Sequence, residues 1–347
     1  MPALIGQLPL PEPSPHFLKL RVAVRRYLTD NPHTAQPAVV GLSGGADSLS
    51  LVAALRAEGH PVLAVCVDHQ LQEGSTGIAH TAAAAARTMG ASAQVVTLSL
   101  QPGPNMEARA RAARYQALAE AAQAAPAAGG NAAGIWLAHT ADDNAETFLL
   151  TALRGQSGGM LPTSSRKIGT TAVTLHRPFL ESRRADTAAA CAEIGLKPWH
   201  DPHNTNTHYR RVALRLEGIP ALAHALGGHD IIPALAQAAT AAAANRASIR
   251  AAAAAALPPN TAEIDIAALT PLQPAVRHEA IAAFIRTHGG RVTHAQVRGI
   301  DNLIMRWHGQ GGVAIGAGKG GERLEVIRKG GKLATALTPN QPHNRDT

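Results

Sequence analysis

The chain has 347 residues, and its 32 lysines and arginines outnumber its 24 aspartates and glutamates, which gives a formal net charge of +8. This length allows about two domains, and the basic balance suits a polyanionic partner such as nucleic acid, although solubility alone explains it equally well. The two cysteines, Cys66 and Cys191, form no CxxC motif, which argues against a disulfide framework or a zinc ribbon and for a reducing compartment. Residues 1–15 lack a signal-like apolar block and no stretch is long and apolar enough to cross a bilayer, so we expect a cytoplasmic protein with no membrane partner.

Apolar runs and helical segments alternate in the first half of the chain. Such runs separated by helices are typical of a parallel sheet covered on both faces. We therefore predict an α/β fold with a doubly wound, Rossmann-like parallel sheet, whose ligands bind at the carboxyl ends of the strands. Strands are expected at residues 38–42, 61–68, 92–98 and 135–138, and helices at 47–58, 76–89, 105–125 and 141–153.

The first predicted strand leads through a glycine turn into a helix. Glycines let the backbone approach a ligand closely, and the first amides of a helix lack internal partners, so this turn favours phosphate. The hydroxyls of Ser43 and Ser48 can donate to phosphate, and the Asp47 carboxylate can hold Mg²⁺. A tight structural connection is the alternative. The turn consists of Ser43, Gly44, Gly45, Ala46, Asp47 and Ser48.

The pattern SGGxDS in this turn differs from the other common phosphate-binding motifs. It has no lysine after the glycines, as a GxxxxGK[ST] loop would, and its glycines are adjacent, unlike those of GxGxxG. It resembles the pyrophosphatase loop of the N-type ATP pyrophosphatases, which split ATP into AMP and pyrophosphate. The resemblance implies that ATP is the ligand.

Asp68 and His69 end the second predicted strand. A carboxylate at this place can accept hydrogen bonds from a ribose or from the adenine amino group. The alternative is that Asp68 caps a turn and His69 packs locally.

Three arginines, Arg109, Arg111 and Arg114, lie in the predicted helix that follows Asn105, its expected N-cap. Arg111 and Arg114 share a helical face with Glu107, whereas Arg109 projects about 160° from Glu107. A solvated charged face is the ordinary explanation for this pattern, and contact with a phosphate is the functional one.

An acidic group follows the fourth predicted strand. His139 follows that strand directly, and Asp142, Asp143 and Glu146 lie at i+3 and i+4 spacing in the helix behind it. Like charges at these spacings repel, so the acids need a cation, either an ammonium group or Mg²⁺. Ordinary enrichment of acids at a helix N-terminus is the alternative.

The second half of the chain suggests a separate domain. Arg211 and Arg215 share a helical face and could contact nucleic acid or lie in solvent. Residues 234–257 are rich in alanine and are expected to form a connecting helix rather than a core element. Two helices near 272–288 and 293–307 and short strands at 312–315 and 323–328 predict a small α+β domain. We expect a catalytic domain over residues 1–217 and the connecting helix with the second domain over 218–347.

Six segments together resemble the tRNA(Ile)-lysidine synthetase family, in its short form with one C-terminal domain. They are SGGADS, VDHQLQEGS, NMEARARAARY, AHTADDNAET, RPFL and WHDPHNTN, in this order. The likeness covers residues 38–215 well and the second domain more loosely. The sequence departs from the family pattern at Gln70, Gln72, Asn144 and the pair Arg210-Arg211.

The resemblance implies a ligase that joins free L-lysine to C2 of the wobble cytidine in a tRNA(Ile) with a CAU anticodon. The cytidine is adenylated by ATP, and the lysine amine then displaces AMP. Asp47 is then assigned to Mg²⁺ or pyrophosphate, and the three arginines of residues 105–115 to adenylate or tRNA phosphate. Asp142, Asp143, Glu146 and His139 are candidates to hold the lysine and accept its proton.

The resemblance also implies tRNA binding by Arg211, Arg215 and the second domain, and it is compatible with a homodimer. Two alternatives remain at this point. A tRNA thiolase of the same class would need a reactive cysteine or an iron–sulfur cluster. A nonenzymatic ATP- or RNA-binding protein would not need the acids after the fourth strand.

Overall fold

The computed structural model describes residues 4–32, 34, 37–70, 74–99, 103–125, 133–257, 261–318 and 322–339. The chain divides into two compact units, Met1–Ala243 and Ala244–Thr347. The division falls inside helix α9 (Ile232–Ala256), later than the expected boundary after residue 217. Within the described residues, no helix combines the length and apolar character needed to span a membrane.

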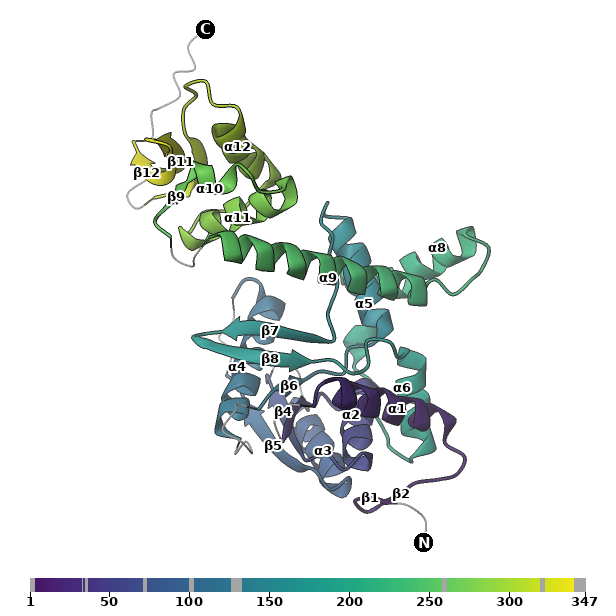
Figure 1. The fold of residues 1–347 in the computed structure, drawn as a ribbon. Helices are drawn as coiled ribbons and strands as arrows, with labels where there is room; N and C mark the ends of the chain where they lie inside the picture. Colours follow the sequence, from purple (N-terminus) through teal and green to yellow (C-terminus); the bar gives the residue numbers. More distant parts are fainter. Residues whose placement is uncertain are drawn as a thin grey trace. The chain divides into compact units, whose positions relative to one another are not determined.

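A six-stranded sheet forms the centre of the first unit, in the order β5-β4-β3-β6-β8-β7 (Figure 1). All neighbouring pairs are parallel except the hairpin β7–β8 at one edge, so the predicted doubly wound parallel sheet is confirmed and the hairpin is an addition. The strand order reverses between β3 and β6, which is where ligands bind in such sheets. The strands are β3 (Ala38–Gly41), β4 (Val62–Asp68), β5 (Ser92–Thr97), β6 (Ile135–Trp136), β7 (Thr163–Ile168) and β8 (Thr171–His176), after a short ribbon of β1 (Leu4–Ile5) and β2 (Leu8–Pro9).

Helices cover both faces of this sheet, because consecutive strand residues point to opposite sides. Val40 joins a core with Phe17 and Leu20 of α1, whereas Val39 joins a core with Leu118 of α4. On the first face, α2 packs against α1, α3 and α6. The helices are α1 (Pro15–Asp30), α2 (Ala46–Ala57), α3 (Ser75–Thr88), α4 (Met106–Ala124), α5 (Ala141–Ala152) and α6 (Arg184–Glu193).

Two helix starts differ in how they are capped. Asn105 precedes α4 as expected, but its φ is +56° and its side chain makes no capping hydrogen bond. Thr140 begins α5 with a capping box, in which Thr140 and Asp143 each bond the other's backbone. This capping box fixes the start of α5 directly after the short strand β6.

Helix α5 is covered by residues that lie beyond the expected domain boundary. Ala141 and Ala145 of α5 pack with Ile219, Ile232 and Ala236. The alanine-rich helix α9 is therefore part of the core of the first unit, and not only a connector. The segments after α6 are η1 (Pro202–Thr205), α7 (Arg210–Ala213), the π-helical turn η2 (Leu214–Gly218) and α8 (Ile219–Ala225).

The second unit is a small α+β domain, as predicted. Its antiparallel sheet has the order β10-β11-β12-β9, and Phe284, Ile300 and Val326 lie in a core between sheet and helices. The sequence did not suggest β9 or β12. The elements are β9 (Glu263–Asp265), α10 (Ile266–Leu269), α11 (Pro274–Thr287), α12 (His294–Met305), β10 (Val313–Ala317), β11 (Arg323–Lys329) and β12 (Lys332–Thr338).

Candidate active site

The turn after β3 has the geometry of an anion site. Gly44 has a φ of +83°, a conformation that only glycine adopts without strain, and a Cβ there would lie 3.3 Å from the Ala82 side chain. Helix α2 begins at Ala46 with no side-chain cap among the described residues, so its first amides are available to a ligand. The Ser48 hydroxyl donates to the Gly45 carbonyl at 3.1 Å and lies 3.2 Å from the exposed Ser43 hydroxyl.

Segments from the end of the first unit hold this turn in place. The backbone N–H of Trp199 donates to the Gly44 carbonyl at 2.9 Å. The Cys191 thiol lies 3.4 Å from the Ala46 carbonyl. The WHDPHNTN segment therefore begins against the 43–48 turn.

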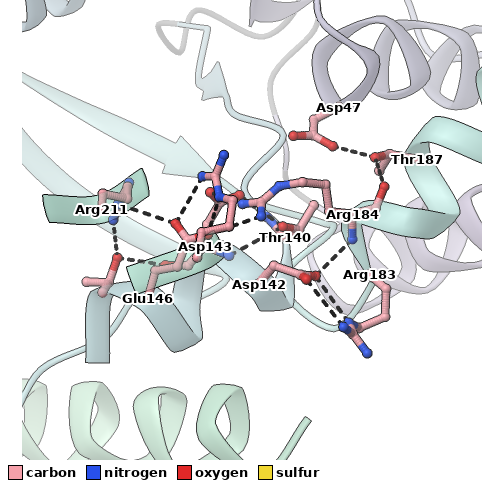
Figure 2. Close-up of polar contacts among 11 residues, drawn as sticks. Asp47, Thr140, Asp142, Asp143, Glu146, Arg183, Arg184, Thr187 and Arg211 are labelled. Atoms are coloured by element: carbon pink, nitrogen blue, oxygen red, sulfur yellow. Dashed lines mark hydrogen bonds and ion pairs between the residues drawn. The ribbon is translucent and has the colours of Figure 1, made fainter. Parts of the chain in front are cut away.

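Asp47 projects from the first turn of α2 toward α6. Its carboxylate accepts a hydrogen bond from the Thr187 hydroxyl (Figure 2). Burial raises the pKa of Asp47 to about 6, and the Thr187 hydrogen bond and the nearby Arg184 only partly offset this effect. A bound cation would therefore stabilise the ionised carboxylate further than the nearby arginines do.

The first two acids of α5 pair with two consecutive arginines at the start of α6. Arg183 donates through Nε to Asp142 at 3.1 Å, and the Arg184 backbone N–H donates to the same carboxylate at 2.9 Å. Arg184 reaches Asp143 at 2.8 Å, while the other oxygen of Asp143 accepts from the backbone and hydroxyl of Thr140. The Arg184 charge and the Thr140 hydrogen bonds outweigh burial and lower the pKa of Asp143.

Glu146 is the most buried of the three acids, with a side chain 1% exposed, and three arginines surround it (Figure 2). Arg215 lies at 2.7 Å, Arg184 at 3.0 Å and Arg211 at 3.5 Å from its carboxylate oxygens. The cation that the acid spacing required is therefore arginine from α6, α7 and η2. We call Asp142, Asp143, Glu146, Arg183, Arg184, Arg211 and Arg215 the acid–arginine cluster.

His139 lies just before α5 with its Nδ1 buried and without a hydrogen-bond partner among the described residues. Burial lowers its pKa to about 4, and the surrounding arginines Arg177, Arg111 and Arg211 act in the same direction. The imidazole is therefore neutral at pH 7, and its unprotonated ring nitrogen can accept a hydrogen bond.

Asp68 has its hydrogen bonds satisfied within its own segment. Its carboxylate accepts from the Gln70 backbone at 3.0 Å, from Ser75 at 2.7 Å and from Thr76 at 2.6 Å. Burial opposes ionisation, but these hydrogen bonds prevail and lower the pKa of Asp68. The contacts are those of the turn-capping alternative, and binding of a ribose or adenine stays a prediction.

The arginines of α4 do not act as one group. Arg114 donates to the ring of His69 at 3.3 Å, which brings two predicted site residues together. Arg111 instead lies over the Tyr115 ring, 5.2 Å from its centroid. Arg109 is half-buried near the start of the helix.

Sequence reasoning missed Arg183, Arg184 and Thr187. Arg183 and Arg184 each lie 41 residues after the acid that they pair with, Asp142 or Asp143, and Thr187 lies 140 residues after Asp47. No motif singled out this segment. The only indication in the sequence was the group of acids at residues 142–146. Their mutual repulsion implied a cation nearby, but their spacing did not identify the residue that carries it.

The comparisons with known proteins agree with this geometry. A PP-loop domain matches residues 19–222. A tRNA(Ile)-lysidine synthase of Corynebacterium glutamicum is 45% identical over 340 residues, which cover 96% of this chain and 99% of the relative. The chain belongs to the tRNA(Ile)-lysidine synthase family. Another tRNA(Ile)-lysidine synthase, from Corynebacterium efficiens, is 48% identical over 96% of this chain and 99% of its own.

Membership of the tRNA(Ile)-lysidine synthase family confirms the resemblance found in the motifs and makes the chain an ATP-using ligase of tRNA modification. A solved U34-tRNA thiolase from Methanococcus maripaludis has 14% identity and a TM-score of 0.48, covering 66% of this chain and 78% of its own. Both cysteines of the chain are buried, and burial raises the pKa of Cys66 to about 11 and that of Cys191 to about 12. Such thiols are unreactive, so the thiolase alternative is not favoured.

Proposed function

We propose that the protein ligates free L-lysine to C2 of the wobble cytidine of a tRNA(Ile) with a CAU anticodon. The C2 oxygen of the cytidine attacks the α-phosphorus of ATP and releases pyrophosphate, and the lysine ε-amine then displaces AMP. The observation that carries the proposal is the uncapped start of α2 beside a cluster of acids and arginines, at the point where the strand order reverses. A protein that only binds a nucleotide would need the uncapped start of α2 but not the cluster of acids and arginines.

The residues of the 43–48 turn suit the phosphates of ATP. The free amides of α2 and the exposed Ser43 hydroxyl supply donors for the leaving pyrophosphate, whereas the buried Ser48 hydroxyl already donates to the Gly45 carbonyl. Asp47 would hold Mg²⁺, because this ion binds through one or two carboxylates and completes its shell with substrate phosphates and water. Mg²⁺ would supply charge neutralisation at the phosphates, and its binding would offset the burial that now raises the Asp47 pKa. Asp68 and His69 are proposed to meet the nucleoside part of ATP.

The acid–arginine cluster suits lysine as a whole and not only an ammonium group. Its three carboxylates face four guanidinium groups, so it carries no net negative charge that would attract a simple cation. Free lysine presents an ammonium and a carboxylate on its α-carbon, and both charges find partners in such a mixed cluster. Asp142 and Asp143 would hold ammonium groups, and the arginines would hold the carboxylate. Glu146 is buried and already paired with three arginines, so its proposed part is to keep these arginines in place and not to meet the ammonium. His139, neutral and close by, is proposed to accept a hydrogen bond from the attacking amine, because its lowered pKa makes it too weak a base to keep the proton at pH 7.

The proposed tRNA contacts are five arginines around this site. Arg109, Arg111 and Arg114 of α4 would meet the adenylate or the tRNA backbone. Arg211, whose side chain is 39% exposed, keeps this role, whereas Arg215 serves mainly to neutralise Glu146. The second unit would bind the body of the tRNA, and a homodimer is compatible with the proposal.

One incubation tests the proposal. The protein, ATP, Mg²⁺ and labelled lysine are mixed with an unmodified tRNA(Ile) transcript bearing a CAU anticodon, and the tRNA is digested to nucleosides. We expect labelled lysidine together with equal amounts of AMP and pyrophosphate. ADP with phosphate as products, and no label on the tRNA, would refute the proposal. A transcript with a GAU anticodon is the matched control and should remain unlabelled.

A further inference from the structure

Most of the net positive charge of the protein lies in the second unit. Residues 244–347 contain 13 lysines and arginines but only 7 aspartates and glutamates, which is a net charge of +6 out of +8. Several of these cations are neutralised locally, as Arg277 is by Asp301 and Arg286 by Glu279. Arg298 and Arg306 are exposed and have no ion-pair partner in the part of the chain that the structure describes. Excess cations of this kind attract a polyanion.

The two arginines flank the second half of α12, near an open hollow. Arg298 and Asn302 are spaced four residues apart on the helix, and Arg306 follows the last helical residue, Met305, as the C-cap. The hollow has a volume of about 340 Å³ and lies between the end of α12 and the start of β10. It is lined by Gly299, Asn302, Leu303, Arg306, His308, Gln310, Gly311 and Val313.

The turn that closes the hollow is held by its own side chain. The Gln310 amide donates to the carbonyls of Asn302 at 3.3 Å and Arg306 at 3.2 Å, and its oxygen accepts from the His308 backbone at 2.8 Å. The polar rim of the hollow is therefore formed before any ligand arrives.

Trp307 lies in the same turn, between two residues that line the hollow, and is 41% exposed. The Arg328 guanidinium lies 5.4 Å from the centroid of its ring. Arg328 is itself fixed, because it donates to the Leu303 and Ile304 carbonyls at the end of α12 at 2.8 and 3.2 Å. A large aromatic ring is thus held in place beside unpaired cations and left open to solvent.

We propose that this end of α12 binds an unstacked nucleotide of the tRNA. The base stacks on the exposed part of Trp307, the flanking phosphates meet Arg298 and Arg306, and the polar rim of the hollow receives the adjoining sugar or base edge. Proteins recognise unpaired RNA by this combination of an aromatic ring and arginines. The inference rests on the proposed function in taking tRNA as the RNA, and the single exposed tryptophan limits the site to about one base.

Fluorescence titration of the full-length chain tests the stacking. The probe is a cytidine hexaribonucleotide, and an RNA duplex of twelve base pairs serves as competitor. We expect the hexamer to quench tryptophan emission, and Trp307→Ala to weaken its binding at least about fivefold, the lower end of what one stacked base contributes. Trp307→Phe should retain most of the binding but lose most of the quenching. The matched control is Met305→Ala, which removes a neighbouring apolar side chain that is 45% exposed and should change nothing.

The salt dependence of hexamer binding tests the two cations. Arg298→Gln and Arg306→Gln should each lower the slope of log Kd against log salt by about 0.7, the value for one contact to single-stranded phosphate. Arg286→Gln is the control, because Arg286 is 48% exposed but already paired with Glu279. An unchanged slope in both test variants would overturn the phosphate contacts.

Lysidine formation by the same preparations separates the two proposals. If the wild-type protein forms lysidine while Trp307→Ala binds the hexamer as tightly as wild type, the inference is wrong and the proposed function stands. If no lysidine forms but hexamer binding depends on Trp307, the site stands and the function is wrong. Competition by the duplex as strong as by the hexamer itself would also overturn the nucleotide site.

Discussion

Arg215 forms a bidentate ion pair with Glu146: its Nε lies 2.7 Å from one carboxylate oxygen and its Nη2 lies 3.1 Å from the other. The pair joins α5 to the π-helical turn η2, 69 residues later in the chain. Because the Glu146 side chain is buried, this contact is an internal one, and removing either charge leaves the other without compensation.

Glu146→Gln should therefore destabilise the first unit strongly. The substitution leaves Arg184, Arg211 and Arg215 facing one another, and breaking a buried pair in this way costs about 3–5 kcal/mol. Urea unfolding measures the loss. The matched control is Glu279→Gln in the second unit, where Glu279 also contacts two arginines but on the surface, and where a loss of no more than about 1 kcal/mol is expected. If both variants lose the same free energy of unfolding, the buried ion pairs of Glu146 contribute no more to stability than the ion pairs of Glu279.

Asp142→Asn should affect the use of lysine more than stability. Asp142 pairs with Arg183, which also contacts Asp230, so the arginine keeps one partner when the acid is neutralised. We expect the KM for lysine to rise about tenfold, the equivalent of one charged hydrogen bond of about 1.4 kcal/mol. The KM for ATP serves as the internal reference and should stay within a factor of two or so. A lysine KM that does not move would place the amino-acid site elsewhere.

Asp47→Asn should abolish most turnover and yet stabilise the protein at neutral pH. The native carboxyl keeps its proton up to a pKa of about 6, whereas the unfolded chain releases it near 3.8. Stability therefore falls as the pH rises from about 3.8 to about 6, and the full cost of the buried charge is present above pH 6. Removing the charge should raise the free energy of unfolding by at most about 3 kcal/mol at pH 7.5, and by less at pH 5. Denaturation at the two pH values, with pyrophosphate release at pH 7.5, measures both effects. A variant that is active, or equally stabilised at both pH values, would contradict the assignment.

The buried histidines should make the fold sensitive to acid. His176 stacks on Trp136 with ring centroids 4.7 Å apart, and burial lowers its pKa to about 4; the pKa of His139 is lowered as far by the same cause. The unfolded chain binds these protons near 6.5, so the stability present above pH 6.5 is lost as the pH falls toward 4, by up to about 3 kcal/mol for each histidine.

Urea midpoints between pH 7 and 4.5 test this dependence. His176→Gln should be less stable than wild type at pH 7, because the stacking is lost, but its midpoint should fall less steeply. Parallel curves for the two proteins would mean that His176 does not titrate in this range.

The fragment of residues 1–243 should fold, and the fragment of residues 1–217 should not. The shorter fragment lacks Ile219, Ile232 and Ala236, which cover Ala141 and Ala145 of α5. It also removes the partners of the buried Asn144 side chain, which donates to Ala236 and Thr240. Circular dichroism and ATP binding compare the two fragments. A folded 1–217 fragment that binds ATP would restore the boundary expected from the sequence.

Local sequence pattern was sufficient for the parts of the fold that a single segment determines. The strands β3 to β6 and the helices between them begin and end within about two residues of their predicted limits, because each is an apolar run bounded by turn residues. The hairpin β7–β8 was missed, since its outer strand includes Ser164, Ser165, Arg166 and Lys167 and has no apolar run.

For each contact in the site, the sequence predicted one of the two partners but not the other. The turn at 43–48 and the acids at 142–146 are contiguous motifs, and both lie where strand order and spacing placed them. Their counterparts Thr187 and Arg184 are isolated side chains, brought in by tertiary packing that no local spacing encodes. Arg215 was singled out by its spacing to Arg211, but not as the partner of Glu146. Asp68 differs from these residues. Its position at the end of β4 was predicted, but its carboxylate accepts hydrogen bonds from Ser75 and Thr76 of its own segment.

The order of the chain also decides when this site can form during synthesis. A ribosome adding about 5–20 residues per second delivers Arg215 several seconds after Glu146, which it follows by 69 residues. Until then α5 has its three carboxylates but not its full set of cations, and they repel one another. We therefore expect this helix to stay solvated in the nascent first unit, and the acid–arginine cluster to close only as the last segments of that unit emerge.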